Sequence, residues 1–228
     1  MLFLMLAFLK IRCRRSLAKL LPRLVTKPGS ELYATLIATK GLIFVFGEIT
    51  TKTRIDYQKT IRNTIKDIGY DSSDKGFDYK TCSVQVGIEE QSPDIAQGLK
   101  LDQALEKLGA GDQGIMFGYA TDETPEYFPL TLQLAHKLNK EMSDSRRNGS
   151  LPWLRPDTKT QVTIEYEDDG GAVVPKRVDT VVVSAQHSEY ITTEYLRKEI
   201  LEKVVKKVIP EKYLDDRTIY HVIHPSAL

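Results

Sequence analysis

The segment from Gly109 to Gly118 places four glycines within ten residues, which limits what the chain around it can fold into. Glycine loses more backbone entropy on ordering than any other residue and adds no side chain to a core. A packed core is therefore not expected to run through this segment. Clustered backbone N–H groups suit a close approach to an anion or to another strand. A tight turn before a strand, with Asp112 as a turn residue, is the alternative.

The sequence before this segment predicts a strand followed by a helix. Residues 42–46 are an apolar run between two glycines, which is typical of a buried strand. Residues 56–68 place apolar side chains on one helical face, and Gly69 marks the end of the helix. The face consists of Ile61, Ile65 and Ile68.

A second strand follows the helix. Residues 70–79 are polar and rich in turn-forming residues, so we expect a loop there. Residues 81–90 alternate as a half-buried strand does. One side of that strand carries Cys82, Val84, Val86 and Ile88. Residues 92–111 are irregular, and their simplest interpretation is a surface loop.

The sequence after the glycines predicts a helix over residues 125–142, capped by Asp122 or Thr124 and ended by residues 146–149. Its apolar stripe has a spacing of four and consists of Leu130, Leu134, Leu138 and Met142.

A hairpin and a last helix complete the pattern. Residues 161–167 and 172–186 are predicted strands joined at Gly170-Gly171. Residues 193–208 predict an amphipathic helix that Pro210 ends. Its inward residues are Leu196, Ile200, Val204 and Val208. Strands and helices are segregated rather than strictly alternating, so the predicted fold class is α+β.

Several motifs occur in one order along the chain. They are Gly47-Glu48-Ile49-Thr50, Gly76-Phe77-Asp78-Tyr79-Lys80, residues 91–98 (QSPDIAQG), residues 109–124 (GAGDQGIMFGYATDET) and residues 151–162 (LPWLRPDTKTQV). Together they resemble the S-adenosylmethionine synthetases (methionine adenosyltransferases) of animals, from about residue 36 to 226. The resemblance implies repeated sheet-plus-helix domains and divides the chain into four parts. These are a leader outside the family (1–35), a partial N-terminal domain with a gating loop (36–105), a central domain (106–226) and a short tail (227–228).

The resemblance also implies an activity, which is the synthesis of S-adenosylmethionine from ATP and L-methionine. The implied ATP-binding residues are Asp112, Asp157, Thr158 and Lys159, and the implied methionine-binding residues are Glu48 and Gln91. A lysine ammonium suits phosphate as a compact point charge, and an amide can hold an amino-acid head group through both its donor and its acceptor. The implied cofactors are Mg²⁺ and K⁺.

The chain departs from the family at positions that matter for catalysis. It has no Gly-His-Pro-Asp-Lys segment, and Thr35 aligns with the family's potassium-binding Glu. The expectation is a chain truncated at both ends, with most ion ligands missing, no assigned catalytic residue and no activity alone. The alternative function is a non-catalytic fragment that dimerises with a full-length homologue or with itself.

The net charge of the chain gives little information about its partners. The 32 Lys and Arg residues nearly balance 31 Asp and Glu, and no apolar run reaches the roughly 18 residues of a membrane span. We expect no nucleic-acid partner and no membrane insertion. Residues 1–30 hold seven basic residues and no acidic one. The expected location is cytoplasmic, and a mitochondrial presequence is the alternative.

Overall fold

The computed structural model describes residues 32–39, 41–49, 56–90 and 114–223. The chain divides into two compact units with a boundary between Phe117 and Gly118. We call the described parts the first unit (residues 32–117) and the second unit (residues 118–223). Each is considered by itself.

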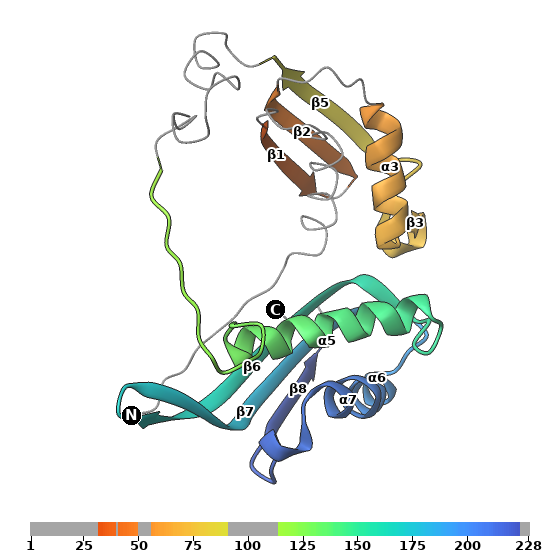
Figure 1. Cartoon of the computed structure of the whole chain (residues 1–228). Coiled ribbons are helices and arrows are strands. Elements are labelled where there is room, and N and C mark those ends of the chain that lie inside the picture. The colour runs from red at the N-terminus through yellow and green to blue at the C-terminus, as the bar shows by residue number, and fades with distance from the viewer. Residues whose placement is uncertain (1–31, 40, 50–55, 91–113, 224–228) are drawn as a thin grey trace. The chain divides into compact units, whose positions relative to one another are not determined.

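The first unit is a three-stranded sheet with one helix (Figure 1). β1 (Leu32–Thr39) and β2 (Leu42–Ile49) pair antiparallel, and β5 (Ser83–Glu89) pairs parallel to β2. Helix α3 (Tyr57–Ile68) connects β2 to β5. The predicted strand–helix–strand order is therefore confirmed. β1 was not predicted, and its first residues overlap the segment assigned to a leader.

Helix α3 begins and ends at the residues that its sequence indicates. The Asp56 carboxylate accepts a hydrogen bond of 2.9 Å from the Lys59 backbone N–H. Gly69 ends the helix with φ of 116°, a left-handed conformation that glycine adopts without a steric cost. The inward face packs into a small core, which consists of Ile43, Val45, Ile61, Ile65, Ile68 and Cys82.

Two details of the first unit differ from prediction. The expected loop contains a small hairpin, β3 (Asp71–Ser72) and β4 (Phe77–Asp78), around the 3₁₀ turn η1 (Ser73–Lys75). Val86 was expected on the buried side of its strand but is 36% exposed. β5 is an edge strand, so the core covers only part of its inner face.

The second unit repeats the same chain order behind an additional helix. Helix α5 (Leu130–Arg147) is followed by the hairpin β6 (Leu154–Asp169) and β7 (Ala172–His187). A helical segment then leads to β8 (Ile219–Ile223), which pairs parallel to β7. The predicted hairpin is confirmed, with Gly170 and Gly171 both at positive φ in its turn. β8 was not predicted.

The helices of the second unit cover one face of its sheet. Helix α5 crosses the β6–β7 hairpin, and the later helical segment lies along β8 (Figure 1). The core between them includes the predicted α5 stripe, together with alternate residues Val181, Val183 and Ala185 of β7. The alternation leaves the intervening residues of β7 on the opposite face.

Helix α5 starts five residues later than predicted and ends at Arg147, within the predicted end signal at residues 146–149. Pro129 disfavours a helical conformation at Phe128, so the helix starts at Leu130. Neither predicted cap acts as one, because Thr124 bonds to the Phe128 backbone. The Glu123 carboxylate instead accepts from the Leu130 N–H and from the Tyr166 hydroxyl, at 3.2 and 2.7 Å. Burial and this carboxylate raise the pKa of Tyr166, so the phenol stays a donor.

The predicted helix over residues 193–208 contains a π-helical turn. α6 (Thr193–Ile200) leads into η3 (Leu201–Val205) and α7 (Lys206–Val208). Leu196, Ile200 and Val204 are buried as predicted, whereas Val208 is half-buried. The extra residue of the π turn shifts the inward face, so Val205 and Ile209 are also buried. None of the described helices is long and apolar enough to cross a membrane.

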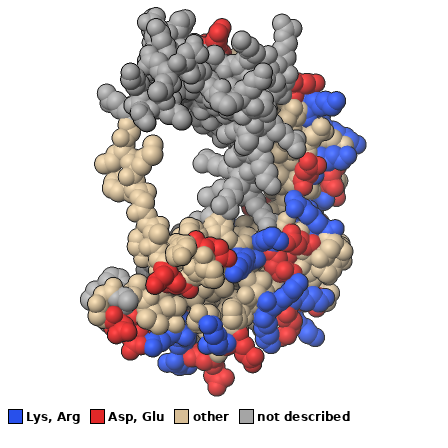
Figure 2. All heavy atoms as spheres, viewed as in Figure 1, with Lys and Arg blue, Asp and Glu red and all other residues tan. Residues whose placement is uncertain are grey.

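Charges of both signs are interspersed on the face of the described surface in Figure 2. Many are arranged as pairs one helical turn apart, such as Lys206 with Glu202 at 2.7 Å. On this face the described residues therefore present no single-sign patch that would steer a polyanion.

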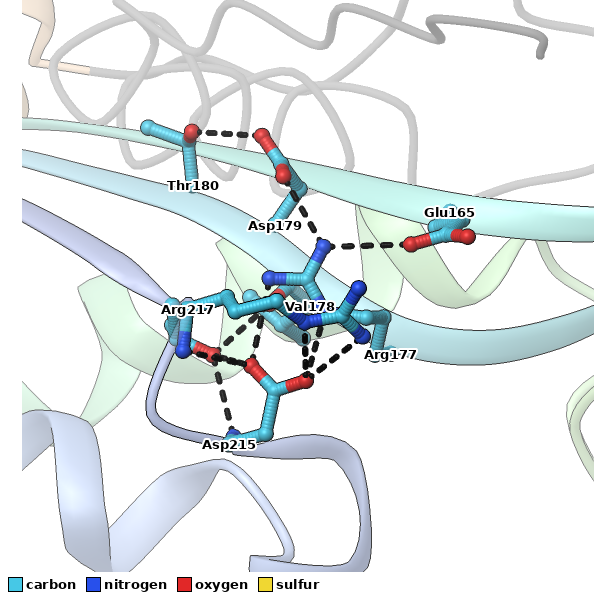
Figure 3. A network of polar contacts seen from close by, with 8 residues as sticks. Glu165, Arg177, Val178, Asp179, Thr180, Asp215 and Arg217 are labelled. Atoms are coloured by element: carbon cyan, nitrogen blue, oxygen red, sulfur yellow. Dashed lines mark hydrogen bonds and ion pairs between the residues drawn. The ribbon is translucent and has the colours of Figure 1, made fainter.

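A polar network joins β7 to the loop before β8 (Figure 3). The Arg177 guanidinium, 11% exposed, donates to both oxygens of Asp215 at 2.9 and 3.2 Å. It also pairs with Asp179 and Glu165 at 2.9 and 3.1 Å. The Thr218 hydroxyl donates to the Val178 carbonyl at 2.9 Å. These bonds hold β8 at the position where it pairs with β7.

The network predicts an acid-sensitive fold. Arg177, followed by Arg217, lowers the pKa of Asp215 from 3.8 to about 2. A lowered folded-state pKa stabilises the protein above the unfolded pKa, and this contribution is lost as the pH falls from about 4 to about 2. Asp215→Asn should lower the melting temperature at pH 7, and its difference from wild type should shrink across that window.

The neighbouring exposed Asp216 provides the matched control, and Asp216→Asn should melt as wild type does at every pH. A constant difference between Asp215→Asn and wild type from pH 7 to pH 2 would contradict the assignment.

Candidate functional site

Residues 157–159 of β6 form the best-defined part of the predicted site. All three are half-buried; Thr158 and Lys159 pair regularly with β7, and Asp157 lies in the register irregularity between Leu154 and Thr158. Alternation along the strand places Asp157 and Lys159 on one face of the sheet and Thr158 on the other. Lys159 is opposite Ser184, and Thr158 is opposite Ala185. Because Ala185 belongs to the core under the helices, Asp157 and Lys159 lie on the helix-free face.

A buried asparagine fixes this part of β6. The Asn139 amide, 4% exposed on α5, donates to the Thr160 hydroxyl at 2.7 Å. Its carbonyl accepts from the Thr158 hydroxyl at 2.8 Å. Thr160 in turn donates to the Ala135 carbonyl at 2.8 Å. The strand is thus held on its inner face, while the two charged residues remain free to face outward.

Lys159 lacks a counter-charge within the described residues. No hydrogen bond or ion pair joins it to any of them, although its side chain is half-buried. By contrast, Lys176, Lys203 and Lys207 all pair with glutamates. A cation on this face that no described residue neutralises attracts anions. The position therefore suits an anionic ligand.

Glu48 lies on the helix-free sheet face of the first unit, near the end of the central strand β2. It follows Phe44 and Phe46 on the face of β2 opposite Ile43 and Val45, which face α3. The two phenyl rings are stacked with centroids 4.8 Å apart. In the parallel register, the partner of Glu48 on β5 is Glu89. Two exposed carboxylates on adjacent strands repel each other, so the position favours a cation.

The predicted residues are therefore placed only in part. Asp157, Lys159 and Glu48 lie on helix-free sheet faces, and the Thr158 side chain faces α5. Gln91 and Asp112 are outside the described residues. Within the described ranges, no group of three or more His, Cys, Asp or Glu residues is arranged to hold a metal ion.

Sequence reasoning missed Asn139. It lies four residues after Ala135 and eight after Thr131, both of which are buried on the same helix. This spacing marks an inward row beside the leucine stripe. A polar residue in such a row must find partners, and the threonines of the facing strand provide them.

These features define a class of protein, in which a hairpin, a helix and a parallel strand form a repeated α+β unit with charged residues on the open sheet face. Two family models match the chain: the S-adenosylmethionine synthetase central domain over residues 107–227, and the N-terminal domain of the same enzyme over residues 20–93. The central-domain match alone spans more than half of the chain, so the chain belongs to the S-adenosylmethionine synthetase family. The N-terminal match begins at residue 20, earlier than the resemblance by motifs.

The Asn139 contacts predict that removing this side-chain amide lowers the stability of the fold. Asn139→Ala should reduce the free energy of unfolding by about 1–3 kcal/mol, because it leaves the Thr158 hydroxyl without its acceptor and Thr160 without its donor. Urea denaturation measures this change. Lys137→Ala, at an exposed position of the same helix, is the control and should change the free energy by less than about 0.5 kcal/mol. Equal effects of the two substitutions would refute the assignment.

Proposed function

We propose that the chain acts in S-adenosylmethionine synthesis and that the second unit binds the triphosphate of ATP through Lys159. The observation that carries this proposal is the half-buried residue Lys159 on the helix-free face of β6, for which the described residues supply no counter-charge. A polyphosphate provides that charge and forms charge-assisted hydrogen bonds to the ammonium. Asp157 lies on the same face of β6, where a carboxylate can accept from the ribose hydroxyls. Thr158 fixes the strand between them through Asn139.

The first unit is proposed to bind methionine. The paired Glu48 and Glu89 carboxylates favour the positively charged amino group of an amino acid. The adjacent Phe44 and Phe46 rings offer an apolar surface to a thioether side chain. Gln91 and Asp112 are proposed to contribute to the methionine and ATP positions, respectively.

The proposed reaction is a displacement at carbon. The methionine sulfur attacks C5′ of ATP, the C5′–O bond breaks, and the triphosphate leaves with the electron pair. Negative charge therefore grows on the leaving group, and the Lys159 ammonium stabilises it. Glu48 holds the amino group of methionine, which orients the sulfur. The triphosphate is then hydrolysed.

Mg²⁺ and K⁺ are implied by the family alone. Asp157 is a single carboxylate beside Lys159, and the described residues form no metal site of their own. Mg²⁺ is expected to arrive as part of the ATP complex.

Lys159→Ala should weaken ATP binding by about 10- to 100-fold, because it removes a charge-assisted hydrogen bond to phosphate. Calorimetric titration of the full chain measures the affinity, and product formation from ATP, methionine, Mg²⁺ and K⁺ measures the activity. Lys137→Ala is the matched control and should bind ATP as wild type does. Unchanged affinity in Lys159→Ala would remove the proposed site.

Glu48→Gln should weaken methionine binding at least about tenfold and leave ATP affinity unchanged, because it removes one charge from the proposed amino-group site. Asn63→Ala, on the exposed side of α3, is the control. Equal loss of ATP and methionine binding in Glu48→Gln would indicate a folding defect instead.

A second candidate function is a non-catalytic subunit that pairs with itself or with a full-length family member. The helix-free face of the second unit favours it, because this face carries Val182 and Ile223, both half-buried, and Ile219, which is 48% exposed. Mixing the chain with a full-length family member should give a shared peak in size-exclusion chromatography and altered enzyme activity. Separate peaks would exclude pairing with that partner.

Localisation of the chain to the cytoplasm, or alternatively to mitochondria, stays a prediction.

A further inference from the structure

One buried hydroxyl in the second unit has no hydrogen-bond partner. Ser184 on β7 is 2% exposed, and its Oγ atom contacts neither a donor nor an acceptor. Leaving a buried hydroxyl unpaired costs about 1–3 kcal/mol. Two other buried hydroxyls of this sheet region, those of Thr160 and Thr218, donate to backbone carbonyls. The unpaired hydroxyl therefore calls for an explanation.

The strand register places Ser184 beside Lys159. These two residues are direct partners across the β6–β7 hairpin, within a regular part of the ladder. Directly opposite residues have Cβ atoms about 4.5–5.5 Å apart on the same face of the sheet. On the other side of Ser184, the partner is Ile223 of β8. Ser184 is thus a small residue in the middle of a row, between a cation and an apolar side chain.

The neighbours of Ser184 along β7 clarify its direction. Val183 and Ala185 are both fully buried in the core under the helices. Because alternate residues of a strand face opposite sides, the Ser184 hydroxyl faces away from that core and toward the side that carries Asp157 and Lys159. A packing role within the core cannot account for it.

We infer that Ser184 is a further binding residue for the triphosphate, donating its O–H to the phosphate oxygen that Lys159 holds. This inference rests on the proposed function. An ammonium and a hydroxyl side by side provide two donors for one anion, and an anionic acceptor satisfies a hydroxyl more strongly than a neutral one. The bound anion thus relieves two unsatisfied groups at once.

The inference predicts that Ser184→Ala weakens triphosphate binding without lowering the melting temperature. In the free chain the substitution removes a polar atom that has no partner, so the melting temperature should stay the same or rise. The affinity for inorganic triphosphate should fall about tenfold, the value of one charge-assisted hydrogen bond. A hydroxyl with a structural role would show the opposite, with a lower melting temperature and an unchanged affinity.

The experiment is calorimetric titration of the full chain with two probes, inorganic triphosphate and adenosine. Wild type is compared with Ser184→Ala, Lys159→Ala and Ser143→Ala, the last being a buried serine on α5. Triphosphate affinity should fall in Ser184→Ala and Lys159→Ala and should be unchanged in Ser143→Ala. Adenosine affinity should be the same in wild type and Ser184→Ala.

The outcomes separate this inference from the proposed function. Weaker triphosphate binding in Lys159→Ala but not in Ser184→Ala overturns the role of Ser184 and leaves the proposed site in place. No effect of Lys159→Ala, or no triphosphate binding by wild type, overturns both. A loss confined to adenosine assigns Ser184 to the nucleoside and overturns its role toward phosphate.

Discussion

The packing of α5 onto the β6–β7 hairpin is the interaction on which the second unit depends. The leucine stripe of α5 and alternate valines of β7 form one core, and α6, η3 and β8 complete it. Because a three-stranded sheet has two faces, this arrangement covers one with helices and leaves the other to a mixture of charged and apolar residues, such as Lys159 and Ile219. The buried Asn139 bonds cross the same contact, so core packing and site geometry are coupled.

Much of the fold was predictable from periodicity, because long segments repeat one pattern. The α3 face, the α5 stripe and the glycine turn of the hairpin were all found in this way. The starting point of α5 was wrong, because a proline at residue 129 outweighs a good capping residue upstream. β1 and β8 were missed, since each depends on pairing with a neighbouring strand, and β8 has only five residues against the sixteen of β7.

The site was less predictable, because its residues were identified by resemblance and not by their environment. Motifs indicated Asp157 and Lys159, but only the strand register shows that Lys159 lies directly opposite Ser184. Asn139 and Ser184 are ordinary residues in the sequence. Their meaning comes from burial and from the presence or absence of a partner, which depend on tertiary contacts.

The π-helical turn at η3 has a consequence for how the second unit tolerates changes in length. A regular helix turns by about 100° per residue, so one extra residue normally rotates everything after it away from the core. Here the extra residue lies within the π turn, so Val204 and Val205 are both buried and the helix after the turn still faces the core. Loss of one residue at this turn would restore a regular helix without burying a charge. The helical crossover between β7 and β8 can therefore lose one residue at η3 without turning its inward face away from the core.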